Sequence, residues 1–324
     1  MLKIAEVTQI PMAPPLRHAL LAAAILFACD SSTPSPAQNS GKSAPAELVK
    51  SPGPSAAGTS ETYNLRGAPV KGATRRAELD LTMADAQMTF KAGPLSFSGV
   101  MTLHVQSSDD LEILEAGDGQ VRKGRLNHVL DKSTMSMRMT MPDGTVETEN
   151  GDENGPLHGR AEAIEFTGGQ WTRTLEGAAA TPQQARLLKD PPMDDAMYPT
   201  ALKVGESWTQ TGPELRRWLG GDFTSTSGEI KNTLLSVDVQ EGEKIAVIES
   251  VGEIRGTMLD DDNRETEISM GIQGTVRRSL DRAVDLDGTS QGAMKMSGEV
   301  VQDGVAVTMS VTGRYTARIT GTLR

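Results

Sequence analysis

Strict alternation of apolar and polar residues over positions 305–323 is the feature that most constrains the fold. One series is apolar or small and comprises Val305, Val307, Met309, Val311, Gly313, Tyr315, Ala317, Ile319, Gly321 and Leu323. The intervening positions are almost all Thr, Ser or Arg. Because successive side chains of a strand point to opposite faces, this pattern predicts a strand with one buried and one wet face. Typical strands have about 5–6 residues, so this one must bend, and Gly313 and Gly321 are the expected bend points.

The same alternation recurs upstream and predicts long antiparallel strands near residues 225–240, 244–258, 265–281, 284–301 and 304–323. Seven dipeptides of the Asn-Gly, Asp-Gly or Glu-Gly kind punctuate the alternating runs, and such dipeptides are typical of tight hairpin turns. They are Asp118-Gly119, Asp143-Gly144, Asn150-Gly151, Asn154-Gly155, Glu241-Gly242, Asp287-Gly288 and Asp303-Gly304. The sequence therefore predicts an all-β protein with long curved antiparallel sheets, arranged as two lobes or as incomplete barrels.

Helix signals are confined to the middle of the chain. Residues 181–184 and 211–214 both fit a capping box with Pro in the first turn, which predicts two short helices. We expect these helices to lie in a connecting segment, residues 179–221. An N-terminal β lobe at 61–178 and a C-terminal β lobe at 222–324 would flank it.

The chain begins with features of a bacterial lipoprotein signal, which we assign to residues 1–28. Arg17 and His18 precede an uncharged apolar run, residues 19–28, that is too short to span a bilayer as a helix, since a span needs about 20 residues. The run ends at Cys29, the only cysteine, and Leu26-Phe27-Ala28-Cys29 resembles a lipobox, which implies a lipid on Cys29. A buried free thiol is the alternative. Translation could start at Met1 or at Met12.

Residues 29–60 differ abruptly in composition from the rest of the chain. They are dominated by Ser, Pro, Ala and Gly and show no apolar period, so the sequence predicts a disordered tether. Such a tether has a root-mean-square span of about 30 Å, enough to hold a folded domain clear of a membrane surface.

Charge and cysteine usage exclude several classes of partner. The net charge of the chain is −11, and removal of residues 1–28, which contain two of the 32 basic and one of the 43 acidic residues, leaves −12. An acidic body argues against nucleic-acid binding and against flat docking on anionic lipid. With Cys29 lipidated, no thiol remains for a disulfide, so packing alone must stabilise the fold.

Four further segments carry a resemblance. KVGESW at 203–208, LLKDPPMDDAMYP before it, and the later GTMLDDD and GTVRRSLD are similar to a family of secreted bacterial lipoproteins with a VGxxW motif and no established activity. The resemblance implies an envelope location and a β-rich fold, and it carries over no catalytic residue. At the level of architecture, the expected sheets resemble the half-barrel carriers of lipids in the periplasm.

A methionine stripe is the one chemically unusual motif. Met135, Met137, Met139 and Met141 alternate with polar residues, and Met294 and Met296 repeat the spacing. At strand spacing these thioethers face one way. Three interpretations stay open, namely core packing, a pliable face for a lipid or other apolar ligand, and copper(I) binding.

Other candidate sites are weak. Trp171 and Trp208 each follow a Gly-containing turn and are candidate groove anchors, with lobe-closing packing as the alternative. Ser290 lies in a GxSxG string, but that motif needs a later His, and no histidine follows His158. We expect no catalytic residues, no metal and no cofactor.

The sequence thus favours a non-enzymatic lipoprotein of the bacterial cell envelope. It would be tied to a membrane through Cys29, outside the cytoplasm, and would bind an apolar small molecule or lipid on a concave sheet. The rival is a structural or adaptor lipoprotein that acts through protein contacts.

Overall fold

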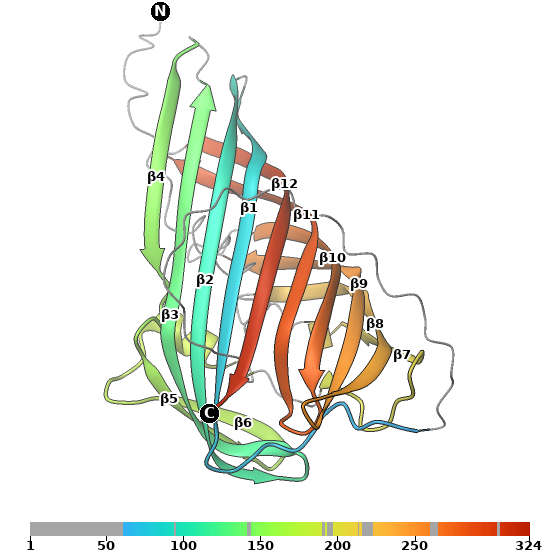
Figure 1. The fold of residues 1–324 in the computed structure, drawn as a ribbon. Coiled ribbons are helices and arrows are strands. Elements are labelled where there is room, and N and C mark those ends of the chain that lie inside the picture. The colour runs from blue at the N-terminus through green and yellow to red at the C-terminus, as the bar shows by residue number, and fades with distance from the viewer. Residues whose placement is uncertain are drawn as a thin grey trace, which may run out of the picture.

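The chain folds into one antiparallel sheet in the computed structural model, which describes residues 61–93, 95–140, 144–189, 192, 197–212, 214–215, 223–259, 265–302 and 305–324. Its strands are β1 (Thr74–Ala92), β2 (Leu95–Gly117), β3 (Gln120–Thr140), β4 (Val146–Asn154), β5 (Ala161–Thr167), β6 (Gln170–Leu175), β7 (Ser207–Thr211), β8 (Phe223–Gln240), β9 (Glu243–Leu259), β10 (Glu265–Ser279), β11 (Val284–Gln302) and β12 (Val305–Leu323). The order across the sheet is β6-β5-β3-β2-β1-β12-β11-β10-β9-β8-β7, and β4 pairs with β3 beside β5. Figure 1 shows the strands side by side in one sheet that curves strongly, so that parts of the orange and red strands pass behind β1–β3.

The predicted all-β class with long curved antiparallel strands is confirmed, and the sheet stays open, with β6 and β7 at its edges. The five strands predicted in the C-terminal half correspond to β8–β12. Strands of both predicted lobes belong to the same sheet, because β1 pairs with β12 from Arg75↔Leu323 to Lys91↔Thr308. The lobe boundaries themselves stay predictions. The signal at 1–28, Cys29 and the tether at 29–60 lie outside the described residues, as does Met141.

Two of the predicted turns have the backbone of a two-residue hairpin. Asp118 and Gly119 join β2 to β3 with φ of 54° and 74°, and Glu241 and Gly242 join β8 to β9 with φ of 53° and 86°. Paired positive φ values match the right-handed twist of the flanking strands. The predicted turn at Asp287-Gly288 is wrong, because both residues lie inside β11, and the one at Asn150-Gly151 is wrong because both lie inside β4.

The connecting segment contains one of the predicted helices, α2 (Pro182–Leu187). Its capping box is complete: the Thr181 N–H donates to Gln184 Oε1 at 2.9 Å, and the Gln184 N–H donates to Thr181 Oγ1 at 3.2 Å. At the second site the Thr211 N–H donates to Glu214 Oε2 at 3.2 Å, and the residues just beyond Leu215 lie outside the described part of the chain. No helix among the described residues is long and apolar enough to cross a membrane.

The bend predicted at Gly313 coincides with a register shift. Between Ala84 and Gln87 the pairing of β1 with β12 slips, and a Cβ on Gly313 would lie 2.7 Å from Cβ of Ala86. A bulge increases local twist and bends the strand, so the absence of a side chain at 313 permits the contact. The pairing continues through Gly321 without a shift.

One face of the sheet, here called the inner face, carries the main hydrophobic core. This core cluster draws buried side chains from β1, β2, β3 and β8–β12, together with Leu215. The opposite, outer face carries the polar series, which includes Arg314, Thr316 and Arg318 of β12. The alternation of the sequence is therefore realised as one apolar and one polar face.

A second, smaller cluster fixes residues 63–67 to the sheet, and we call it the clamp. It contains Tyr63, Leu65, Tyr198, Leu202, Leu234, Ala246 and Ile248, with Trp208 and Leu280 packed against it. Tyr63 and Leu202 form a backbone bridge with N···O distances of 2.8 and 3.0 Å. The clamp thus attaches the chain that immediately follows the predicted tether to the β8–β11 end of the sheet.

Candidate functional site

The core of the inner face is unusually rich in methionine. Ten of the 24 buried residues that form it are Met. Met135, Met137 and Met139 of β3 belong to it and are at most 6% exposed, and so do Met294 and Met296 of β11, at most 2% exposed. The structure therefore brings the predicted stripe and its repeat into one cluster, with Met141 outside the described residues.

Cross-strand register aligns these side chains in rows. Met137 pairs with Met101 of β2, and Met135 pairs with Leu103, which in turn pairs with Met83 of β1. Directly opposite side chains on one face lie about 4.5–5.5 Å apart, so the rows form a continuous apolar surface. Unbranched thioethers adapt their shape with little strain, and such a surface can repack around different apolar shapes.

The inner face becomes ionic toward β5, near the lower end of the sheet in Figure 1. His128 Nδ1 lies 2.8 Å from Asp109 Oδ1, and His128 Nε2 lies 3.1 Å from Glu162 Oε1. Glu162 is 0% exposed and also accepts hydrogen bonds from Arg173 Nε at 2.9 Å and Arg173 Nη2 at 2.5 Å. Burial lowers the pKa of His128, but the two carboxylates outweigh it and raise that pKa to about 10. His128 is therefore a cation at neutral pH and donates to both carboxylates.

α2 and the loop at 155–160 cover this ionic end. The Arg173 Nη1–H donates to the Leu187 carbonyl at 3.1 Å, and Gln184 Nε2 donates to the Pro156 carbonyl at 2.7 Å. The Asp131 N–H donates to His158 Nδ1 at 3.1 Å. The capped helix thus has a role in the fold, because it holds the loop that is hydrogen-bonded to residues 128–131 in the middle of β3.

Asp131 differs from the neighbouring carboxylates Asp109 and Glu162, which are paired with His128. Its Oδ1 is buried without a hydrogen-bond partner among the described residues, and Gly155 packs so closely that a Cβ there would overlap the carboxylate. Burial raises the pKa of Asp131 to about 6, and the nearby Asp109 carboxylate adds to the increase. A raised carboxyl pKa means that the folded state favours the protonated form, so ionisation at neutral pH lowers stability.

Asp131→Asn is therefore expected to raise the free energy of unfolding at pH 7 by about 1–3 kcal/mol, because the substitution removes the buried charge. The gain should shrink as the pH falls from about 6 toward the ordinary carboxyl pKa of 3.8, where wild-type Asp131 is itself protonated. Urea denaturation at pH 7 and pH 4.5 measures both values. A variant less stable than wild type at pH 7 would show that the ionised carboxylate has a stabilising partner.

Five residues of the polar end, Ser107, Asp109, His128, Asp131 and Glu162, are not among the site residues predicted from the sequence. A signal was present for Asp131, because it shares the odd-numbered series of Ser133, Met135, Met137 and Met139 and so lies on the methionine face. The ion pairs of His128 depend on the pairing of β3 with β2 and β5, which no local pattern specifies.

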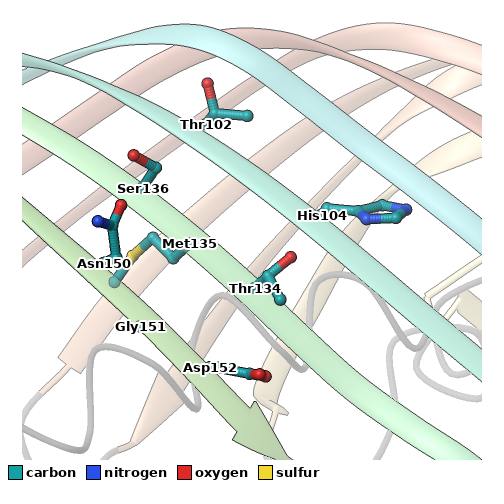
Figure 2. A pocket seen from close by; sticks show the side chains of 8 residues that line it. All are labelled: Thr102, His104, Thr134, Met135, Ser136, Asn150, Gly151 and Asp152. Atoms are coloured by element: carbon teal, nitrogen blue, oxygen red, sulfur yellow. The ribbon is translucent and has the colours of Figure 1, made fainter.

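A shallow hollow of about 380 Å³ lies across β2, β3 and β4 (Figure 2). Two cross-strand rows of polar residues line it, Thr102↔Ser136↔Asn150 and His104↔Thr134↔Asp152. Gly151 of β4 and Met135 of β3, which pair across the two strands, also line the hollow. His104 Nε2 lies 3.0 Å from Asp80 Oδ1, and both side chains are partly exposed. Within the described residues, no group of three or more His, Cys, Asp or Glu side chains has a metal-holding arrangement.

Both predicted groove anchors lie away from the methionine core. Trp171 of β6 packs on Phe166 of β5, with ring centroids 5.2 Å apart. Trp208 belongs to the clamp, where its ring centroid lies 6.4 Å from that of Tyr198. The structure does not bring the two tryptophans together, and their role as ligand anchors stays a prediction.

No family model and no curated protein matches this chain. Among solved structures, a DUF1329 family protein from Desulfovibrio piger is 11% identical, with coverage of 77% of this chain and 85% of that chain and a TM-score of 0.13. The COG4313 outer membrane channel from Pseudomonas putida is also 11% identical, with coverage of 78% and 97% and a TM-score of 0.17. At these scores neither likeness bears on function, and the resemblance to VGxxW lipoproteins stays a prediction.

Proposed function

We propose that this protein is a lipid-anchored lipoprotein of the bacterial cell envelope that holds an apolar ligand or lipid on the inner face of its sheet. The observation that carries the proposal is the methionine content of that face, ten of the 24 core residues, contributed by strands from both ends of the chain. Methionine-rich surfaces are typical of binding sites that accept different apolar shapes. In the described residues these methionines are at most 6% exposed and pack against one another within one cluster, so a ligand would enter by displacing flexible side chains.

The location rests on the N-terminal sequence. The basic residues Arg17 and His18, the apolar run at 19–28 and the lipobox-like end at Cys29 support export and lipidation. The tether at 29–60 would let the sheet stand clear of the membrane while it remains attached. We assign no catalytic residue, metal or cofactor to this function.

A second candidate is a structural or adaptor lipoprotein with a filled core. Burial of the described stripe residues, Met135, Met137 and Met139, favours it, because such packing is also what a permanent core shows. The two candidates differ in one measurable respect, since only the carrier has a lipid that leaves and rebinds.

Native and denaturing mass spectrometry of the full chain, extracted from its own membrane in mild detergent, separates the two proposed roles of lipid. We expect wild type to show a covalent acyl mass that survives denaturation and a second lipid mass that does not. Cys29→Ala should lose the covalent mass and the membrane attachment while it retains the non-covalent lipid when vesicles of the same lipids are supplied. Consistently empty wild-type protein would support the adaptor, and an unmodified Cys29 would refute the anchor.

A further inference from the structure

The inner face changes from apolar to polar along its strands. On β3 the series Met139, Met137 and Met135 continues into Ser133 and Asp131. On β2 the series Met101, Leu103 and Val105 continues into Ser107 and Asp109. The two series lie side by side and become polar at the same end, because Leu103 pairs with Met135 and Ser107 pairs with Asp131. One buried surface is therefore apolar at one end and polar at the other.

Two neighbouring polar atoms at the polar end have no hydrogen-bond partner among the described residues. They are Ser107 Oγ and Asp131 Oδ1, and each residue is 8% exposed. Because their residues pair across β2 and β3, the two side chains lie side by side on the inner face. A buried hydroxyl or carboxylate oxygen without a partner is costly, and each such group in a folded protein calls for an explanation.

The charges around Asp131 define what these atoms would bind. Asp109 faces it from β2, His128 lies on β3 itself, and His158 faces it from the loop at 155–160. His128 is already held by Asp109 and Glu162, at 2.8 and 3.1 Å, so it is not the partner of Asp131. An ionised Asp131 accepts hydrogen bonds only, and the Ser107 hydroxyl both donates and accepts. A hydrogen-bond donor placed between them satisfies both.

We propose that the ligand of the inner face is an amphipathic lipid whose headgroup donates a hydrogen bond to Asp131 Oδ1 and contacts Ser107 Oγ. Its apolar chains lie along the methionine rows. This inference rests on the proposed function and adds the chemistry of the headgroup, a hydroxyl or an ammonium. Gly155 packs against the Asp131 carboxylate, so the loop at 155–160 moves when the headgroup enters.

Three phospholipids with the same dioleoyl chains test the headgroup. Phosphatidylethanolamine has an ammonium donor and phosphatidylglycerol has hydroxyl donors, whereas phosphatidylcholine has none. The delipidated full chain is incubated with vesicles containing equal amounts of the three, and native mass spectrometry measures the lipid retained. We expect at least one of the two donor lipids to be retained about tenfold over phosphatidylcholine, the factor that an unpaired buried acceptor implies. Preference for the ammonium or for the hydroxyl lipid identifies the donor.

Variants of the polar end complete the test. In Ser107→Ala and in Asp131→Asn, the ratio of donor lipid to phosphatidylcholine retained should fall toward 1. The total amount of lipid retained should stay the same. Ser136→Ala, on the outer face of β3, is the matched control and should leave the preference unchanged. Because Asp131→Asn is expected to be at least as stable as wild type, misfolding would not explain its result.

The outcomes separate the two proposals. If wild type retains no lipid at all, the proposed carrier function fails. If it retains all three lipids equally, or if both variants keep the wild-type preference, the carrier function stands and the headgroup assignment is wrong. Ordered water would then be the partner of the two oxygens.

Discussion

Replacing Arg278 by methionine is expected to lower the free energy of unfolding by about 3–5 kcal/mol, the usual effect of breaking a buried ion pair from one side. Arg278 is 2% exposed, and its Nη1 lies 2.8 Å from Asp285 Oδ1. The Nε–H donates to the Leu65 carbonyl at 2.7 Å, and Nη2 donates to the Arg66 carbonyl at 3.0 Å. The guanidinium carbon lies 3.9 Å from the centroid of the Tyr198 ring. Methionine fills similar space but replaces none of these polar contacts.

The Arg278→Met variant should lose structure locally before the whole protein unfolds. The two carbonyls held by Arg278 belong to the segment at 63–67, so that segment is expected to detach from the sheet first. Limited proteolysis with trypsin should then cleave after Arg66 faster in the variant than in wild type, while guanidinium denaturation measures the global change. Tyr198→Phe removes the hydroxyl that donates to Asp285 Oδ2 at 2.9 Å, and we expect it to have a smaller effect in the same direction.

The adjacent residue supplies a matched control. Arg277 of β10 pairs with Asp287 at 2.7 Å, but both side chains are partly exposed. Arg277→Met removes the same charge from the same strand and should cost about 0–1 kcal/mol, as partly exposed ion pairs do. Equal effects of the two substitutions would mean that the buried contacts of Arg278 contribute no more than a partly exposed ion pair.

Local signals predicted most of the fold. Alternation and turn dipeptides located β8–β12, because each strand has one buried and one wet face and the chain reverses at short turns. The turn predicted at Asp287-Gly288 is wrong because Gly288 has another use. A Cβ at Gly288 would lie 3.1 Å from the Thr275 carbonyl and 3.3 Å from Cγ2 of Val276, so the glycine permits close approach of β10 inside the ladder. An Asp-Gly dipeptide reads the same whether its glycine forms a hairpin turn or allows close strand approach, so the sequence does not distinguish the two.

Contacts between distant segments were beyond local signals. The pairing of β1 with β12 joins the two ends of the folded chain, and nothing in either segment alone specifies the other as its neighbour. Three of the four segments that carry the resemblance meet at the clamp, because Tyr198 lies beside Trp208 and the Arg278 guanidinium lies over the Tyr198 ring. In KVGESW, Gly205 has φ of 88° and the Lys203 N–H donates to Glu206 Oε2 at 2.8 Å, which makes the string a turn. These motifs therefore have a structural use in this chain.

The Glu162→Gln variant carries the second large prediction, a loss of about 3–5 kcal/mol at pH 7. Glu162 is fully buried and accepts hydrogen bonds from both His128 and Arg173. Burial raises the pKa of Glu162, but the hydrogen bonds from His128 and Arg173 outweigh it and hold that pKa below its ordinary value. The carboxylate is therefore ionised at pH 7, and its replacement by a neutral amide leaves two buried cations with less compensation.

The pH dependence of stability tests the same cluster independently. The pKa of His128 is raised to about 10 in the folded protein, against an ordinary value of 6.5. Its contribution to stability is complete below 6.5 and is lost as the pH rises toward 10, with a slope of up to about 1.4 kcal/mol per pH unit. Glu162→Gln lowers the pKa of His128 in the folded protein, so the decline should still begin near pH 6.5 but end at lower pH. Chemical denaturation at intervals from pH 6 to pH 10 measures the slope.

The control for Glu162 lies three residues away on β5. Glu165 is exposed and pairs with Lys123 at 3.4 Å, so Glu165→Gln should change stability by no more than about 1 kcal/mol and leave the alkaline slope unchanged. A wild-type stability that is flat between pH 7 and pH 10 would show that His128 is neutral when folded. The ionic end of the inner face would then hold one positive charge fewer, which would also remove a positive neighbour of Asp131. The headgroup preference would shift toward the ammonium lipid, so the alkaline slope and the lipid selectivity report on the same buried charge.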